Sequence, residues 1–247
     1  MRKKLLLLFT AFLMLAAGSA WFLSRTSKPH PLVTIPDSSV KTNQANNQPM
    51  PSFDKTKHPT DKADSIWVIA SKVSELNPLQ YAPTDLVAIG NGQQLRKEAA
   101  SAWIEMTTAA KASGFNLQPL SGYRSYATQV SVYNKEVATY GQATTDKQSA
   151  KPGRSEHQTG LALDVGGGGC GIEDCFGNTA EGKWLAANAH SYGFIIRYVP
   201  GKESITGYRA EPWHIRYVGK ELSLEMKRTA ISTLEEFFNL VPEKQPY

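Results

Sequence analysis

The chain has 247 residues, of which 41% are hydrophobic and 20% charged, and its formal net charge at pH 7 is +5. This composition excludes a disordered tail and a polytopic membrane protein, and two cysteines are too few for a disulfide-stabilised miniature scaffold. The length predicts one or two domains with a sizeable hydrophobic core, while the positive charge leaves a nucleic-acid or membrane partner open until its location is known.

The N-terminus predicts a membrane-targeting segment over residues 1–28. Three basic residues at positions 2–4 precede an apolar run over residues 5–23, which is long enough to cross a bilayer as a helix. The basic end then stays in the cytoplasm and the rest of the chain is exported. We interpret the segment as a retained anchor, and the small residues 18–20 offer a cleaved signal peptide as the alternative.

The positive charge is confined to this segment. Residues 1–28 contain five basic and no acidic residues, which leaves 22 basic and 22 acidic residues in the remainder. The exported part is therefore formally neutral, and we expect no nucleic-acid partner. Residues 29–60 are rich in Pro, Ser, Asn, Gln and Lys without a hydrophobic period, which predicts a disordered linker before a domain at 61–247.

Hydrophobic periodicity predicts the elements of that domain. We expect a strand or short helix at 65–76, helices at 95–113, 126–140 and 180–192, and strands at 115–120, 161–165, 194–198 and 214–218. Gly114, Gly141 and Gly193 follow the three helices as C-caps. Because the helices come first and the short strands cluster later, we expect an α+β fold. This fold would be a single domain with a mostly antiparallel central sheet flanked by helices.

Two segments carry candidate metal ligands, SEHQTGLALD at 155–164 and EPWH at 211–214. His157, Asp164 and His214 provide two imidazoles and a carboxylate, a set that binds zinc and leaves a position for water. Asp164 ends an apolar strand, where a bound cation would offset the cost of burying its charge. Taken alone, each segment is weak evidence, because His214 also suits a core histidine and Glu211 a surface ion pair.

Glu211 is the candidate general base. It precedes His214 by three residues, a spacing that places the two side chains on opposite faces of a regular strand. Pro212 favours the first position of a strand, so we expect Glu211 on the loop that enters it. There it would lie beside the metal, where a base can take a proton from a metal-activated water.

These segments resemble a known family. SEHQTGLALDV and EPWH are similar to the metal-binding motifs of the zinc D,D- and L,D-carboxypeptidases of peptidoglycan, the VanY-type family, and SGYRSYATQ at 121–129 resembles its third motif. The similarity spans about residues 65–220. It implies a zinc D,D-peptidase fold of the hedgehog-like kind and one Zn²⁺ per chain, with His157, Asp164 and His214 as ligands and Glu211 as the catalytic base.

The same resemblance assigns three substrate contacts. It implies that Arg124 stabilises the substrate and its oxyanion, and that Gln129 and Ser155 lie near the substrate's terminal carboxylate. The planar fork of an arginine suits either oxyanion, whereas lysine lacks that geometry. From the residues alone, Arg124 equally suits a structural role in which it bonds carbonyls of its own turn.

We therefore expect a zinc metallopeptidase that removes the C-terminal D-alanine from peptidoglycan stem peptides on the outer face of a bacterial cell membrane, as a monomer. It would act as a D,D-carboxypeptidase on pentapeptides or an L,D-carboxypeptidase on tetrapeptides. The alternatives are an endopeptidase, a D-Ala-D-Ala dipeptidase, and a non-catalytic zinc-stabilised module that binds the cell wall.

Cys170 and Cys175 flank a short loop after the four-glycine run at 166–169. Outside the cytoplasm we expect a local disulfide between them rather than free thiols. Two cysteines provide too few ligands for a second metal site. The glycine run lacks the lysine of a phosphate-binding loop, which favours a flexible rim near the cleft.

Overall fold

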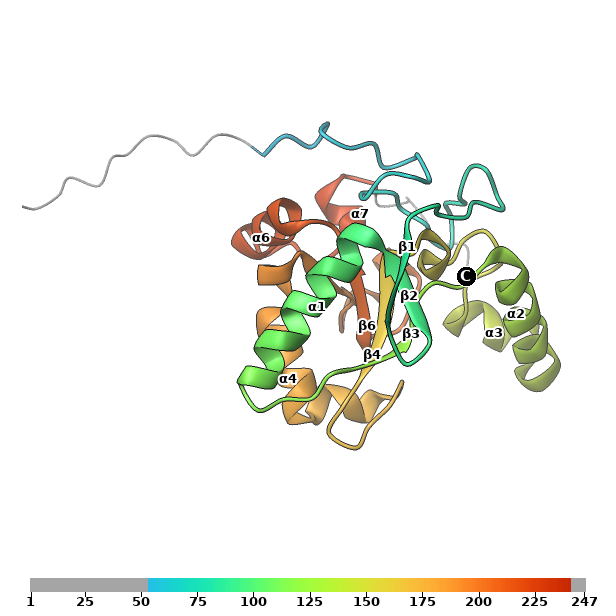
Figure 1. The fold of residues 1–247 in the computed structure, drawn as a ribbon. Helices are drawn as coiled ribbons and strands as arrows, with labels where there is room; N and C mark the ends of the chain where they lie inside the picture. The colour runs from blue at the N-terminus through green and yellow to red at the C-terminus, as the bar shows by residue number, and fades with distance from the viewer. Residues whose placement is uncertain (1–52, 241–247) are drawn as a thin grey trace, which may run out of the picture. The chain divides into compact units, whose positions relative to one another are not determined.

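The computed structural model describes residues 53–240 (Figure 1). The predicted anchor and the linker up to residue 52 lie outside the described residues and stay predictions. Residues 53–60 are described, and the rings of Phe53 and His58 lie 5.5 and 4.8 Å from the ring of Trp67. Across 53–240, no helix combines the length and apolar character that a membrane span requires.

The centre of the fold is a four-stranded antiparallel sheet in the order β3-β4-β6-β5. Its strands are β3 (Gln118–Ser121), β4 (Ala162–Gly166), β6 (Glu211–Tyr217) and β5 (Phe194–Tyr198). A separate hairpin pairs β1 (Leu86–Gly90) with β2 (Gln93–Arg96). The predicted mixture of helices with an antiparallel sheet is therefore confirmed.

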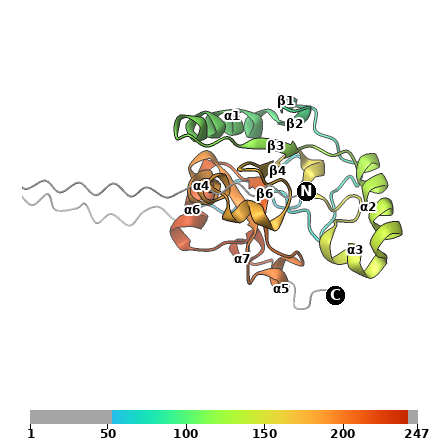
Figure 2. The same cartoon turned by 90° about the horizontal axis from the view of Figure 1, so that it is seen from below.

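Helices lie on both sides of this sheet. The α-helices are α1 (Lys97–Ala112), α2 (Tyr126–Tyr140), α3 (Gln142–Gln148), α4 (Ala180–Asn188), α5 (Glu203–Thr206), α6 (Lys220–Thr229) and α7 (Leu234–Phe237). The 3-10 helices are η1 (Glu156–Thr159), η2 (Asp174–Asn178) and η3 (Ala189–Tyr192). Figures 1 and 2 show α2 and α3 together at one end of the molecule, away from α1, α4 and α6.

The periodic segments match their predicted elements closely. The helix at 126–140 has the predicted bounds, begins with the side chain of Ser125 accepting the Thr128 amide, and ends at Gly141. The helix predicted from residue 95 begins at Lys97, because residues 95 and 96 pair in β2. The segment 180–192 is divided between α4 and η3, and Gly193 follows in the left-handed conformation.

The prediction of a strand or helix at 65–76 is wrong, because this segment has no regular structure. Its backbone groups bond to distant partners instead of a neighbouring strand. Arg216 donates hydrogen bonds to the carbonyls of Ile66 and Val68, at 3.1 and 2.7 Å. The Trp67 indole donates to the Val218 carbonyl at 2.9 Å. The segment is therefore held by long-range bonds that its own sequence does not reveal.

Alternation along the strands gives the sheet two chemically different faces. Leu163, Val165 and Ile215 belong to the hydrophobic core that also contains buried residues of α1 and α4. Their strand neighbours Asp164 and His214 lie on the opposite face, as period-two geometry requires. The sheet thus separates an apolar core from a polar face on which the candidate site is built.

Candidate metal centre and active site

Two central strands and a preceding turn bring the predicted metal ligands together. Asp164 on β4 and His214 on β6 are directly opposite partners in the antiparallel ladder, so their side chains are neighbours. His157 lies in η1, which ends at Gly160 with φ of 67°. This left-handed glycine reverses the chain into β4 and brings the imidazole over Asp164.

The three ligands form a compact, buried group. One oxygen of Asp164 lies 2.9 Å from Nδ1 of His214, and the other lies 3.3 Å from Nε2 of His157. One ligand atom from each residue falls within 4.8 Å of the others, and their exposed fractions are 4–6%. Two imidazoles and a carboxylate facing a cavity fit the open three-ligand arrangement that divalent zinc adopts in catalytic sites. A cation would also relieve the burial of an otherwise costly carboxylate.

The electrostatics of the ligands suit a cation. Burial acts to raise the pKa of Asp164, but the adjacent His157 and His214 hold it far below its usual range. Burial lowers the pKa of His157 and favours its neutral form. Burial also disfavours a charged His214, yet the carboxylates of Asp164 and Glu156 raise its pKa to about 9. Metal binding at His214 would compete with protonation of the imidazole, because a metal binds the neutral ring.

The ring of His157 is fixed from behind by the backbone. Its Nδ1 lies 2.8 Å from the carbonyl oxygen of Gly122, which leaves Nε2 directed at Asp164. A ligand imidazole characteristically donates its second N–H to such an acceptor. The SGYR segment thus contributes the support for one ligand through Gly122.

Glu211 lies beside His214, but for a different reason from the one the sequence suggests. The prediction that Glu211 lies on an entering loop is wrong, since β6 begins at this residue. Between the pairs Ile196–Ile215 and Tyr198–Glu211, β6 advances four residues while β5 advances two. The ladder is therefore irregular next to Glu211, and one oxygen of Glu211 lies 3.9 Å from Nδ1 of His214.

The environment of Glu211 suits a proton acceptor near neutral pH. Burial, opposed by the nearby His214, raises the pKa of its carboxyl to about 7. A base is most effective when its pKa is close to the working pH. The carboxyl of Glu211 is therefore suited to accept a proton near neutral pH.

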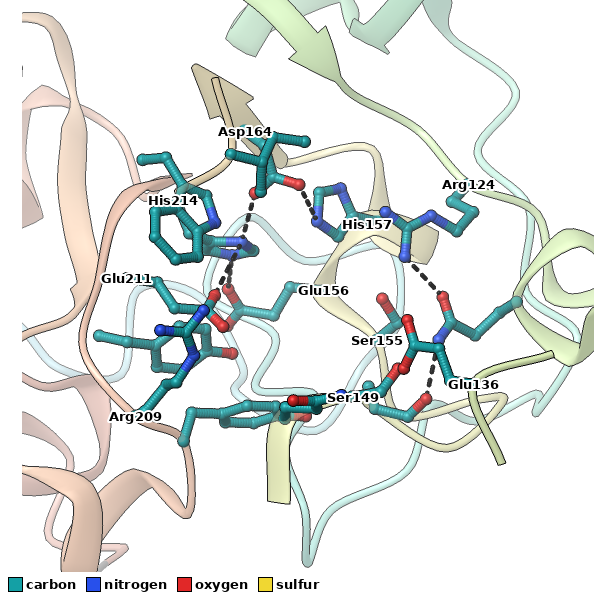
Figure 3. Close-up of a pocket in the computed structure, with 17 residues that line it drawn as sticks. Arg124, Glu136, Ser149, Ser155, Glu156, His157, Asp164, Arg209, Glu211 and His214 are labelled. Atoms are coloured by element: carbon teal, nitrogen blue, oxygen red, sulfur yellow. Dashed lines mark hydrogen bonds and ion pairs between the residues drawn. The ribbon is translucent and has the colours of Figure 1, made fainter. Parts of the chain in front are cut away.

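The metal ligands and the predicted substrate contacts share one cavity of about 260 Å³. Figure 3 shows Arg124 on one side of this cavity and Glu211 with His214 on the other. Arg124 donates to Gln129 Oε1 at 3.0 Å and to the Ser121 hydroxyl at 2.8 Å, and Gln129 in turn donates to the Ala150 carbonyl at 2.8 Å. The guanidinium is thus aimed by two side chains toward the cavity that it lines.

The structure brings every predicted metal ligand, the predicted base and the predicted substrate contacts to this cavity, Ser155 included, and adds several residues that the sequence reasoning missed. The missed residues include Glu136, Glu156, Tyr208 and Arg209. Tyr208 and Arg209 have no local signal, because their position depends on the turn before β6. Glu156 did have a signal, since a carboxylate between Ser155 and His157 is flanked by two predicted site residues.

The most buried of the missed residues is Glu156, whose charge is balanced by two arginines. Its Oε1 accepts hydrogen bonds from Arg197 on β5 and Arg216 on β6, each at 2.8 Å. Arg197 also forms a two-pronged pair with Glu235, at 2.8 and 2.6 Å. Burial acts to raise the pKa of Glu156, but the two guanidinium groups hold it well below its usual range. This buried ion cluster lies on the same sheet face as the metal ligands.

The glycine-rich loop after β4 also borders the cavity. Cys170 and Cys175 form a disulfide there, with Cα atoms 6.0 Å apart. Ile172, between the two cysteines, lines the cavity and is 43% exposed. The loop therefore contributes a covalently closed rim at one edge of the candidate site.

Comparison with known proteins assigns this arrangement to a family. Residues 92–220 match the VanY family model, described as D-alanyl-D-alanine carboxypeptidase. The chain is 45% identical over 189 residues to YodJ of Bacillus subtilis (strain 168), an alignment that covers 72% of this chain and 68% of that protein.

Comparison with solved structures supports the same family assignment. The chain is similar to the LdcB LD-carboxypeptidase, with a TM-score of 0.67 and 42% identity over 73% of this chain and 88% of that one. It is also similar to a variant of the vancomycin resistance D,D-pentapeptidase VanY in complex with Zn(II), with a TM-score of 0.62 and 31% identity over 70% of this chain and 98% of that one. The chain therefore belongs to the VanY family of carboxypeptidases.

Proposed function

We propose that the chain is a zinc-dependent peptidase that removes the C-terminal D-alanine from peptidoglycan stem peptides outside the cytoplasmic membrane. The observation that carries this proposal is the convergence of His157, Asp164, His214, Glu211 and Arg124 on one cavity. The Zn(II) complex of the VanY relative and the LD-carboxypeptidase activity named for LdcB support it. Attachment through the N-terminal segment and a monomeric state remain part of the same proposal.

Each group in the cavity has a chemical task in amide hydrolysis. His157, Asp164 and His214 would hold the zinc, which would act as a Lewis acid that polarises the scissile carbonyl and lowers the pKa of a bound water to about 7. Glu211 accepts a proton from the attacking water and passes it to the nitrogen of the departing D-alanine. Its raised pKa allows it to act first as a base and then as an acid.

Arg124 selects the end of the peptide chain. Its guanidinium is held by hydrogen bonds to Gln129 and Ser121 and lines the cavity, so it offers paired N–H donors to a terminal carboxylate or to the developing oxyanion. The hydroxyl of Ser155 lines the same cavity and can add a further donor. A carboxylate-binding arginine close to the reacting centre accounts for cleavage of the last peptide bond rather than an internal one.

The test is the product spectrum of the purified full chain on defined tetrapeptide and pentapeptide muropeptides, with and without a chelator. We expect chelator-sensitive release of free alanine from at least one of them, and the preferred substrate distinguishes L,D- from D,D-activity. Release of alanine from neither would overturn the proposal. Release of D-Ala-D-Ala or of larger fragments would replace it with a dipeptidase or an endopeptidase.

A matched pair of variants separates catalysis from binding. Glu211→Gln removes the base but keeps the size of the side chain, so we expect zinc content to remain and kcat/KM to fall roughly 10²–10⁴-fold. Glu203→Gln, an exposed glutamate on α5, serves as the control and should retain full activity. Equal activity of the two variants would favour a zinc-stabilised wall-binding module with contaminating hydrolysis.

A further inference from the structure

The two nitrogens of His214 face different carboxylates. Nδ1 is directed at the other ligands, 2.9 Å from Asp164 Oδ1. Nε2 lies 3.5 Å from Oε2 of Glu156, slightly beyond a normal hydrogen bond. Among the described residues, neither His214 Nε2 nor Glu156 Oε2 has a hydrogen-bond partner, although both atoms are buried. Two buried, unsatisfied and complementary atoms therefore face one another across a short gap, as Figure 3 shows.

Glu156 is held firmly in this position. Its Oε1 accepts from Arg197 and Arg216, and both arginines are fully buried. Arg197 is fixed by its ion pair with Glu235. Arg216 donates hydrogen bonds to the backbone carbonyls of Ile66 and Val68 in the irregular segment 65–76. The two negative charges of Glu156 and Glu235 balance the two positive charges of the arginines. The cluster can thus keep Oε2 pointed at His214 without an uncompensated buried charge.

A metal bound at Nδ1 requires that nitrogen to be free of a proton, so the remaining proton of a neutral ring resides on Nε2. The acceptor that faces Nε2 is Glu156 Oε2. We propose that Glu156 is a positioning residue of the metal centre, which holds the ring of His214 with Nδ1 toward the metal by accepting the Nε2 proton. This inference rests on the zinc site of the proposed function.

The two histidine ligands are then supported in parallel ways. His157 is paired with a neutral backbone carbonyl at Gly122, whereas His214 is paired with a buried carboxylate. An anionic acceptor makes its imidazole a stronger electron donor than a carbonyl does. The loss of such an outer partner characteristically weakens metal binding about 10–100-fold.

The test compares Glu156→Gln with Glu235→Gln in the full chain. Both remove one negative charge that faces Arg197, but only Glu156 faces His214. Zinc affinity is measured by competition with a chromophoric chelator, and the thermal stability of the metal-stripped proteins is measured alongside. We expect both variants to unfold at lower temperature, zinc affinity to fall about 10–100-fold in Glu156→Gln, and Glu235→Gln to stay within about threefold of the wild type.

Equal weakening of zinc binding in both variants, or none in Glu156→Gln, would overturn the proposal. If Glu156→Gln does not fold, Glu156→Asp keeps the charge but withdraws it from His214, and the same loss of affinity is expected. Nitrogen-15 NMR of the zinc-loaded wild type should show a proton on Nε2 of His214 that exchanges slowly with water and becomes fast in the variant. Failure of the wild type to bind zinc would instead refute the proposed function, so the two failures are distinguishable.

Discussion

Substitution of Gly122 tests how the backbone supports the proposed metal centre. A Cβ atom at this position would lie 2.5 Å from the carbonyl oxygen of Gln94 and 3.3 Å from its nitrogen. Both are backbone atoms, so no side-chain rotation relieves the contact. The same oxygen of Gln94 already accepts the amide of Tyr123 at 2.8 Å. In Gly122→Ala the end of β3 must therefore move away from the β1–β2 hairpin.

We expect two effects of Gly122→Ala. Overpacking of this kind destabilises a protein by about 1–3 kcal/mol, which urea unfolding of the metal-stripped full chain measures. Displacement of the Gly122 carbonyl also disturbs its 2.8 Å contact with Nδ1 of His157. Zinc affinity should therefore fall by roughly tenfold in a competition titration, as expected for the loss of an outer partner.

Gly171→Ala is the matched control. A Cβ there would meet only Leu120 Cδ1 at 3.9 Å, an ordinary contact, and Gly171 does not have a positive φ. Its stability should be unchanged or raised by about 0.4–1 kcal/mol through the unfolded state. The reasoning is refuted if Gly122→Ala unfolds at the same urea concentration as Gly171→Ala and binds zinc as tightly.

Three further substitutions address other parts of the fold. Cys175→Ser opens a loop with a sequence separation of 5, so we expect a loss of about 2 kcal/mol in thermal or urea unfolding, matched by adding reductant to the wild type. Leu163→Ala creates a cavity at a fully buried position behind the metal face and should lower the free energy of unfolding by about 2–5 kcal/mol. Ser125→Ala removes the N-cap of α2, which should cost about 1 kcal/mol and raise KM, because α2 carries Gln129.

The regular elements were predictable because their periods are local. The segments that became α2 and β5 carry their own hydrophobic pattern, and their ends are marked by glycine. The β1–β2 hairpin was not predicted, although Asn91-Gly92 between its strands is a strong turn signal and both residues have positive φ. The irregular segment 65–76 was not predictable, because two of its carbonyls accept hydrogen bonds from Arg216, about 150 residues later in the chain.

The candidate site shows the same limit at the level of single residues. The presence of Glu211 near the metal ligands followed from the EPWH segment, but the means by which it reaches them did not. The strand ladder is irregular next to Glu211, because β6 has two extra residues relative to β5, and such an irregularity depends on the register of the partner strand. Pro212 does indicate where β6 begins and becomes irregular, since proline within sheets is largely confined to edges, strand starts and bulges.

The turn that contains His157 explains why a short motif can carry so much of the site. A 3-10 helix has three residues per turn, so consecutive side chains of η1 diverge by about 120°. Glu156 reaches the buried arginines and His157 reaches the metal ligands. Gln158 donates to two backbone carbonyls at 2.8 and 3.1 Å, and Thr159 bonds back to the carbonyl of Glu156 at 2.6 Å. A strand would offer only two directions, both perpendicular to the sheet, and could not send Glu156, His157 and Gln158 in three different directions. Substitution of any of the four should therefore disturb metal binding, although His157 is the only ligand among them.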